Sequence, residues 1–172
     1  QYITRVGRLD TVMSAIDKAL RLELHPVKIN TVLIRGFNDD EILDFAAMAY
    51  ERPLHVRFIE FMPIGDLQFW DRGNIISSQE TKDIISGRYR LLDAKKIKGS
   101  GPARYFNLEG GQGSIGFISP MSNHFCSACN RIRMTAEGKL RGCLYDKREV
   151  DLKQAMENGA SDEQLRQMFL ET

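Results

Sequence analysis

The run Val27-Lys28-Ile29-Asn30-Thr31-Val32-Leu33-Ile34 predicts a β-strand, because β-branched and other apolar residues dominate it. Apolar residues recur at helical spacing before this run, over residues 9–23, and after it, over residues 42–49. A second strand is expected over residues 54–61. This order of helix, strand, helix and strand predicts two parallel strands joined by a right-handed crossover.

Two parallel strands cannot form a covered sheet by themselves, so residues 1–75 are expected to be part of a larger barrel or doubly wound domain. Residues 76–172 differ, because short strand candidates alternate there with glycine-rich stretches. Gly110-Gly111-Gln112-Gly113 is interpreted as a hairpin turn, and residues 131–144 as a second hairpin. The predicted fold class is therefore an α/β part followed by a smaller α+β module.

Three patterns resemble capping boxes, in which side chains at the start of a helix bond to backbone groups three positions away. They pair Asn38 with Glu41, Ser77 with Glu80, and Ser161 with Gln164. The last two predict helices that end near residues 87 and 170.

Composition and charge exclude several classes of protein. The 172 residues are 42% hydrophobic and 27% charged, which is ordinary for a globular protein and excludes intrinsic disorder. With 24 Lys or Arg against 23 Asp or Glu, the net charge of +1 gives no general attraction to nucleic acid or to a membrane surface. No apolar run approaches the ~18–20 residues of a membrane span. We therefore expect neither nucleic acid nor a membrane among the partners.

All three cysteines lie within residues 126–143, as Cys126-Ser127-Ala128-Cys129 followed after 13 residues by Cys143. An odd number of cysteines indicates an intracellular protein, here expected in the cytoplasm, whose thiols bind or react rather than form disulfides. A C-x2-C turn directs two thiolates at one ion or cluster, and the far strand of the predicted hairpin supplies the third. Packing of cysteines in a core would not explain this clustering.

Two kinds of metal site fit this pattern. A structural zinc ion needs four ligands, and His124 is the candidate for the fourth. An iron–sulfur cluster held by three thiolates leaves one iron open to a substrate, whereas an electron-transfer cluster is expected to have four thiolates. The interpretations that stay open are an open-iron cluster, a structural zinc-knuckle binding module without catalysis, and an electron-transfer domain.

Basic residues accompany the cysteines. Arg131 and Arg133 are two positions apart, so on an extended strand their side chains point to one face and can clamp a phosphate. Lys139 and Arg141 add positive charge on the other strand of the hairpin. The alternative is a solvated basic face, but the neighbouring thiols favour an anion-binding site.

The two predicted parallel strands carry polar residues that a buried parallel strand usually lacks. Lys28 and Asn30 share one face of the first strand, His55 and Arg57 share one face of the second, and Glu60 lies on the opposite face. Such residues are costly to bury unless they are paired or face a wet cavity. A barrel lumen that binds a charged ligand would explain them, and so would an internal ion pair of Arg57 with Glu60.

Five segments of the chain together form a recognisable signature. In chain order they are Val27-Lys28-Ile29-Asn30-Thr31-Val32, Arg35-Gly36-Phe37-Asn38-Asp39, Arg57-Phe58-Ile59-Glu60-Phe61-Met62-Pro63-Ile64-Gly65, Phe125-Cys126-Ser127-Ala128-Cys129-Asn130-Arg131-Ile132-Arg133 and Gly138-Lys139-Leu140-Arg141-Gly142-Cys143-Leu144. These segments resemble the GTP 3′,8-cyclase family of radical SAM enzymes, also called molybdenum cofactor biosynthesis protein A. The resemblance covers nearly the whole chain, in order, and implies the C-terminal half of such an enzyme.

The resemblance implies that residues 1–75 supply the last βα units of an incomplete (βα)6 radical SAM barrel, and that residues 76–172 form its small C-terminal module. It implies that Cys126, Cys129 and Cys143 hold a second [4Fe-4S] cluster, whose open iron binds the purine of GTP. Other roles implied are contact with GTP for Lys28, Arg131, Ile132 and Arg133, contact with S-adenosyl-L-methionine (SAM) for Met62, and catalysis for Arg57.

Members of this family use SAM-derived radical chemistry to cyclise GTP to (8S)-3′,8-cyclo-7,8-dihydroguanosine 5′-triphosphate in molybdenum cofactor biosynthesis. The resemblance implies GTP as the substrate and cyclic pyranopterin monophosphate synthase as the downstream partner. The C-x3-C-x2-C motif that holds the first [4Fe-4S] cluster, which binds SAM, is absent from these 172 residues, so the chain is expected to be inactive alone. A half-barrel also leaves an unpaired strand edge, which predicts a homodimer or a rearrangement of the first ~60 residues.

Overall fold

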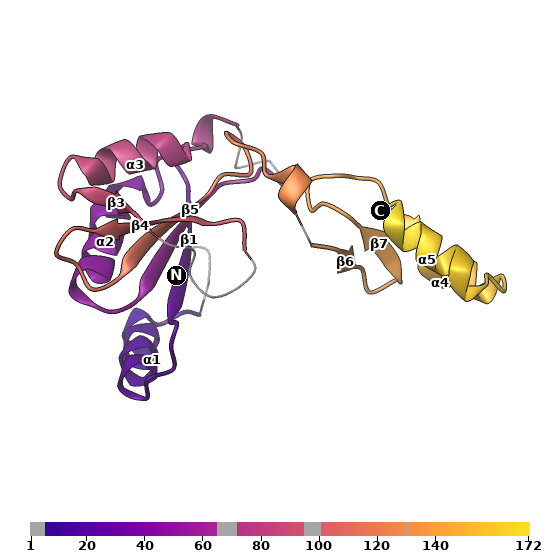
Figure 1. Ribbon diagram of the computed structural model, residues 1–172, viewed down its shortest axis with the longest axis horizontal. Helices are drawn as coiled ribbons and strands as arrows, with labels where there is room; N and C mark the ends of the chain where they lie inside the picture. The colour runs from indigo at the N-terminus through magenta and orange to yellow at the C-terminus, as the bar shows by residue number, and fades with distance from the viewer. Residues whose placement is uncertain (1–5, 65–71, 95–100, 130) are drawn as a thin grey trace. The chain divides into compact units, whose positions relative to one another are not determined.

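The computed structural model describes residues 6–64, 72–94, 101–129 and 131–172 of the chain. These residues belong to two compact units (Figure 1). The first unit consists of the described residues within 1–61 and 70–125. The second consists of the described residues within 62–69 and 126–172. No helix in the described ranges is long and apolar enough to cross a membrane.

A five-stranded mixed sheet lies at the centre of the first unit, with the strand order β1-β2-β5-β4-β3. Three strands run parallel: β1 (Lys28–Leu33), β2 (His55–Glu60) and β5 (Ser114–Ile118). Two antiparallel strands extend the sheet: β4 (Arg104–Leu108) and β3 (Leu91–Asp93). The predicted parallel pairing of the first two strands is confirmed, with Lys28 opposite His55 and Leu33 opposite Glu60.

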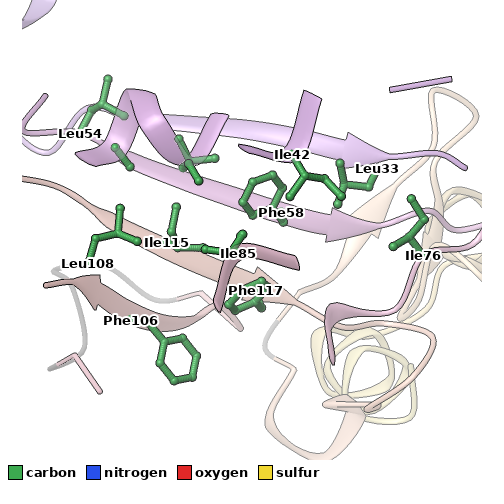
Figure 2. Packing of buried hydrophobic residues seen from close by; sticks show 13 residues of the cluster. Leu33, Ile42, Leu54, Phe58, Ile76, Ile85, Phe106, Leu108, Ile115 and Phe117 are labelled. Carbon is green, nitrogen blue, oxygen red and sulfur yellow. The ribbon is translucent and has the colours of Figure 1, made fainter. Parts of the chain in front are cut away.

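Helices cover one face of this sheet. The first unit contains α1 (Leu9–Arg21), α2 (Ile42–Glu51) and α3 (Ser78–Ser86), with single turns η1 (Asp39–Glu41) and η2 (Arg72–Asn74). Both α2 and α3 contact β2 and each other. Thirteen buried apolar residues form the core between these helices and the sheet (Figure 2). Among them, the rings of Phe58 and Phe117 stack with their centroids 6.2 Å apart.

The strands β3, β4 and β5 belong to the first unit, which differs from the expected division at residue 75. All five residues of β5 are buried, as is usual for a strand in the middle of a covered sheet. Gly113 allows the chain to approach β2 closely, because a Cβ atom there would lie 2.0 Å from the backbone oxygen of Leu54. The described strands of the first unit form one open mixed sheet, in which the expected βα order is present but a closed (βα)6 barrel is not observed.

One predicted turn and one predicted capping box have the expected form. The glycine-rich segment 110–113 joins the antiparallel strands β4 and β5, and Gly110 has a φ of +77°, which favours glycine. At the start of the helix α5 (Asp162–Leu170), the Ser161 hydroxyl accepts from the backbone N–H of Gln164 at 3.3 Å. The Gln164 side chain accepts from the N–H of Ser161 at 2.8 Å, which completes a capping box.

The other two capping boxes are incomplete or absent. Ser77 accepts from the N–H of Glu80 at 3.1 Å, as predicted, but the Glu80 carboxylate binds Arg35 instead of the Ser77 N–H. The prediction for Asn38 is wrong. Its side chain accepts from the N–H of Ile34 at 2.8 Å and donates to a carbonyl within β1 at 3.0 Å, so it fastens the end of β1 rather than capping a helix.

The second unit is a small antiparallel sheet with two helices. Its strands are β6 (Arg133–Met134), β7 (Lys139–Arg141) and β8 (Val150–Asp151), its helices are α4 (Leu152–Glu157) and α5 (Asp162–Leu170), and the single turn η3 (Cys126–Ala128) precedes them. The hairpin predicted over residues 131–144 is confirmed, with Gly138 at a φ of +84° in its turn. The sequence pattern predicts neither β8 nor α4, because two and six residues are too few to show a periodicity.

Candidate functional site

The cysteines of the second unit lie on a tight turn and just beyond a strand. Cys126 begins η3, and the N–H of Cys129 donates to the carbonyl of Cys126 at 3.1 Å, which closes the C-x2-C segment into one turn. Cys143 follows the end of β7, and its Sγ accepts from the N–H of Tyr145 at 3.4 Å. All three thiols are free and exposed. The predicted turn and hairpin are therefore both present around the cysteines.

The thiols are not gathered into a ligand set. Within the described ranges, no three or more His, Cys, Asp or Glu side chains form a group that could hold a metal ion. His124, the candidate fourth zinc ligand, is also exposed. What the structure offers is a set of three accessible sulfur donors, one of which already accepts a backbone N–H. This donor set fits an iron–sulfur cluster, because thiolates are its usual ligands and N–H groups commonly bond to the sulfurs.

The four basic residues of the hairpin are not equivalent. Arg141 donates from Nε to the Glu149 carboxylate at 2.6 Å, and the Lys139 ammonium lies 3.6 Å from the same carboxylate. Glu149 therefore neutralises much of the charge on the β7 strand. In the described part of the chain, no acidic side chain pairs with Arg131 or Arg133. The anion-binding capacity of the hairpin thus rests mainly on these two arginines.

Arg133 lies directly opposite Arg141 in the β6–β7 ladder. Like charges that face each other across a sheet repel. The carboxylate of Glu149, which binds Arg141, therefore reduces the repulsion between Arg141 and Arg133. Arg131 and Ile132 are exposed just before the strand, with 49% of Ile132 accessible. Glu149 is not predicted as a site residue, because its position eight residues after Arg141 gives no local pattern that would reveal it.

In the first unit, the predicted polar face exists and continues onto β5. Arg57 donates from Nε to Oδ1 of Asn30 at 2.6 Å, between residues that are opposite each other in the β1–β2 register. Lys28 is opposite His55, and Nδ1 of His55 lies 2.8 Å from the Ser114 hydroxyl on β5. The four polar residues named from the sequence therefore share one face, and Ser114 extends it.

The centre of this polar face is covered by Tyr105 and Arg57, which can approach each other there because Gly116 has no side chain. A Cβ atom at Gly116 would lie 2.8 Å from the ring of Tyr105 and 3.1 Å from Cγ of Arg57. Tyr105 and Arg57 thus meet over the glycine. Ser114, Gly116 and Tyr105 are not predicted as members of this face. The alternation of small residues with apolar ones in Ser114–Ile118 is the signal that could have identified it.

His55 is expected to be uncharged near neutral pH. Partial burial lowers the pKa of His55 most, and the nearby positive charges of Lys28, His25 and Arg57 lower it further. A neutral imidazole can accept or donate to the Ser114 hydroxyl without adding charge to the polar face.

Glu60 takes no part in the polar face, and the ion pair of Arg57 with Glu60 that was considered as an alternative is not formed. Glu60 is 3% exposed on the opposite face. Its carboxylate accepts from the N–H groups of Ser78 at 2.7 Å and of Met121 and Ser122 at 2.9 Å each, and also from the Ser122 hydroxyl. Burial alone would raise the pKa of Glu60, but these hydrogen bonds outweigh it, so the pKa is lowered.

Met62, the residue expected at the SAM pocket, follows β2 by two positions and is half-buried. It belongs to the second unit, whereas Lys28 and Arg57 belong to the first. The predicted site residues therefore come from both units: Lys28 and Arg57 from the sheet, and Met62, the three cysteines, Arg131, Ile132 and Arg133 from the second unit.

Comparisons with known proteins identify the family. A family model described as Molybdenum Cofactor Synthesis C matches residues 54–172. The chain is 63% identical over 170 residues to a protein named GTP 3′,8-cyclase from Syntrophomonas wolfei subsp. wolfei, an alignment that covers 99% of this chain and 52% of that protein. A protein of the same name from Desulforamulus reducens is 51% identical over 164 residues, which cover 95% of this chain and 50% of that protein.

The chain thus spans about half the length of the curated relatives that it matches. The resemblance inferred from the five sequence segments is confirmed by these relatives, and the match to the family model extends over more than half of the chain. The chain belongs to the Molybdenum Cofactor Synthesis C family.

Proposed function

We propose that this chain is the C-terminal part of a radical SAM GTP 3′,8-cyclase and provides its GTP-binding end. The observation that carries the proposal is the identity of 63% over 99% of the chain with a protein of that name. The second unit adds chemical support, because it combines three accessible thiols with two arginines that lack acidic partners in the described part of the chain. We propose that the protein acts in the cytoplasm, in molybdenum cofactor biosynthesis.

Cys126, Cys129 and Cys143 would hold the [4Fe-4S] cluster of this end of the enzyme. Three thiolates on four irons leave one iron open, and such an iron can bind the purine of GTP. The exposure of all three thiols and the N–H donated to the sulfur of Cys143 support this assignment. The chain's own contribution is to hold two thiols on a single turn and the third at the end of a hairpin strand.

Arg131 and Arg133 would bind the triphosphate of GTP, with Ile132 in contact between them. Guanidinium groups suit phosphate oxygens, because they donate two parallel hydrogen bonds and stay charged at all relevant pH values. The pairing of Glu149 with Arg141 and Lys139 supports this assignment. It neutralises the basic residues of β7 and leaves Arg131 and Arg133 to bind the phosphates.

Lys28 and Arg57 would contribute from the polar face of the first unit. Lys28 would contact GTP, and Arg57 would act in catalysis, with its guanidinium oriented by the hydrogen bond to Asn30. Met62 would contact SAM. In the whole enzyme, SAM-derived radical chemistry would cyclise GTP to (8S)-3′,8-cyclo-7,8-dihydroguanosine 5′-triphosphate, which cyclic pyranopterin monophosphate synthase would consume.

Substitution of the arginines in the full-length enzyme tests this proposal. Arg131→Ala and Arg133→Ala should each weaken GTP binding by about 1.5–3 kcal/mol, because each removes charge-assisted hydrogen bonds. Cyclisation should be lost while SAM cleavage in the absence of GTP is retained. Lys147→Ala, an exposed basic residue outside the hairpin strands, is the matched control and should leave both reactions unchanged. GTP affinity that is the same in all three variants would contradict the proposal.

The 172-residue chain by itself should not turn over GTP, because its three cysteines supply only one cluster and the C-x3-C-x2-C motif is absent from it. Cyclisation of GTP by the purified chain with SAM and a reductant would contradict this part of the proposal. A homodimer through the exposed edge of β1 is a further expectation, which sedimentation of the chain tests.

A further inference from the structure

The N-terminal turn of α3 lies at the carboxyl ends of all three parallel strands. After β1, Arg35 donates to both carboxylate oxygens of Glu80, at 3.0 and 2.7 Å. At the end of β2, Glu60 accepts from the N–H of Ser78 at 2.7 Å. Directly after β5, the Ser119 hydroxyl donates to the Ser78 hydroxyl at 2.7 Å. One helical turn, residues 78–80, therefore holds three strand ends.

Glu60 makes the most hydrogen bonds among the residues that connect these strand ends. Its carboxylate bonds to one N–H of α3 and to three donors in residues 121–122. Four donors on a carboxylate that is 3% exposed make a site in which the negative charge is satisfied and fixed in orientation. Charge-assisted hydrogen bonds of this kind are about twice as strong as neutral ones.

The segments that Glu60 fixes lead directly to proposed site residues. Met62 follows Glu60 by two positions, and Cys126 follows Ser122 by four. In parallel α/β sheets, ligands bind outside the carboxyl ends of the strands, so the conformation of these ends matters for a site.

We propose that Glu60 is a positioning residue of the proposed cyclase. It sets the backbone of residues 119–122 against the end of β2 and the first turn of α3, and thereby sets the starting points of the segments that carry Cys126 and Met62. This role rests on the proposed function for its effect on GTP, but the hydrogen bonds themselves are independent of that function. Glu60 touches no reacting group in this account and acts only through the segments that it holds.

Glu60→Gln is the direct test, because glutamine has nearly the same shape but presents an NH₂ donor where the carboxylate accepts. Hydrogen exchange of the chain measures the effect locally. The amides of Ser78, Met121 and Ser122 should lose protection by at least about tenfold, whereas the amides of Val56 and Phe58 within β2 should change by less than about threefold. Glu51→Gln, on the exposed end of α2, is the matched control and should leave all these amides unchanged.

In the full-length enzyme, Glu60→Gln should lower kcat for GTP cyclisation by at least about tenfold, while KM for GTP changes by less than about threefold. This split is expected because Arg133 is held by the β6–β7 hairpin, with Arg131 just before it, so these arginines can still bind the triphosphate while the segment before Cys126 no longer has one conformation. A fall in stability alone would reduce the amount of folded enzyme and leave kcat per folded molecule unchanged. Ser122→Ala removes only the hydroxyl donor, and it should reproduce both effects at smaller size if Glu60→Gln does not fold.

Equal loss of protection in residues 119–122 and in β2, or unchanged protection at Met121 and Ser122, would overturn the positioning role. An unchanged kcat per folded molecule would overturn it as well. If the wild-type enzyme does not cyclise GTP, the proposed function fails, but the exchange pattern still decides whether Glu60 holds residues 119–122. The two proposals can therefore fail separately.

Discussion

The two units of the chain differ in what stabilises them. The first unit buries thirteen apolar residues in one cluster, between the sheet and helices α2 and α3 (Figure 2). In the described part of the second unit, the buried apolar side chains are Leu140 and Leu152. A unit with so little core usually needs a metal, a cluster or another partner to be stable. The comparison indicates that the first unit has a stabilising apolar core of its own, and that the described part of the second unit has little such core.

The largest expected effect is on the core of the first unit. Phe58→Ala should lower the free energy of unfolding of the first unit by about 3–5 kcal/mol, because the ring is 2% exposed and stacks on Phe117. Urea unfolding followed by circular dichroism measures this change. Ile84→Ala, 39% exposed on α3, is the control and should cost far less. Similar losses for the two variants would contradict the description of the core.

The next effect separates the units. Leu140→Ala should destabilise the second unit by about 2–5 kcal/mol, because Leu140 is 1% exposed and has few apolar neighbours to replace it. Hydrogen exchange should then show loss of protection in β6 and β7 while β1 and β2 stay protected. Met134→Ala on the neighbouring strand, where Met134 is 59% exposed, should change little. Loss of protection in both units together would show that they do not unfold separately.

A smaller effect depends on pH. Glu60→Gln should lower the free energy of local opening of residues 119–122 by about 2–3 kcal/mol at neutral pH, because it removes hydrogen bonds to a buried charge. Since the pKa of Glu60 is lowered in the folded state, its contribution is fully present above its unfolded pKa and is lost as the pH falls through the folded pKa. The difference from wild type should therefore narrow between neutral pH and about pH 3. A difference that is constant over this range would contradict the lowered pKa.

The smallest expected effect concerns the charges of the hairpin. Glu149→Gln should free Arg141 and raise the affinity of the chain for inorganic triphosphate by about two- to fivefold at low salt, with the gain lost at high salt. The same change should reduce stability by less than about 1 kcal/mol, because the pairs are partly exposed. Glu157→Gln on α4 serves as the control. Unchanged affinity would show that Glu149 does not limit the positive charge available to an anion.

The sequence predicted those helices and strands that are long enough to show a regular spacing of apolar residues. The run at 27–34, the helix at 42–49 and the hairpin around Gly138 all appear close to their expected bounds. The predicted sharing of one face by Lys28, Asn30, His55 and Arg57 also follows from strand alternation alone, and the register confirms it. The turn at Cys126–Ala128 and the hairpin before Cys143 could likewise be predicted, because both are local structures, but within the described residues the three thiols do not form a ligand group.

Contacts between distant residues could not be predicted in this way. The pairing of β5 with β2 joins residues about sixty positions apart, and no periodicity reports which strands become neighbours. Glu80 matches the capping pattern, but its carboxylate bonds to Arg35, which is 45 positions away in the chain. The four donors to Glu60 come from two segments that lie 18 and 61–62 positions further along the chain, so the ion pair of Arg57 with Glu60 stayed open as an alternative.

The central claim, that the second unit holds an iron–sulfur cluster with an iron open to GTP, is tested most directly by anaerobic reconstitution of the chain. We expect about four iron and four sulfide per chain, and an electron paramagnetic resonance spectrum of the reduced cluster that changes when GTP is added. Cys143→Ser should remove the cluster, and Arg131→Ala should keep it but weaken the response to GTP. One tightly bound zinc ion without sulfide, or a cluster whose spectrum is the same with and without GTP, would contradict the account.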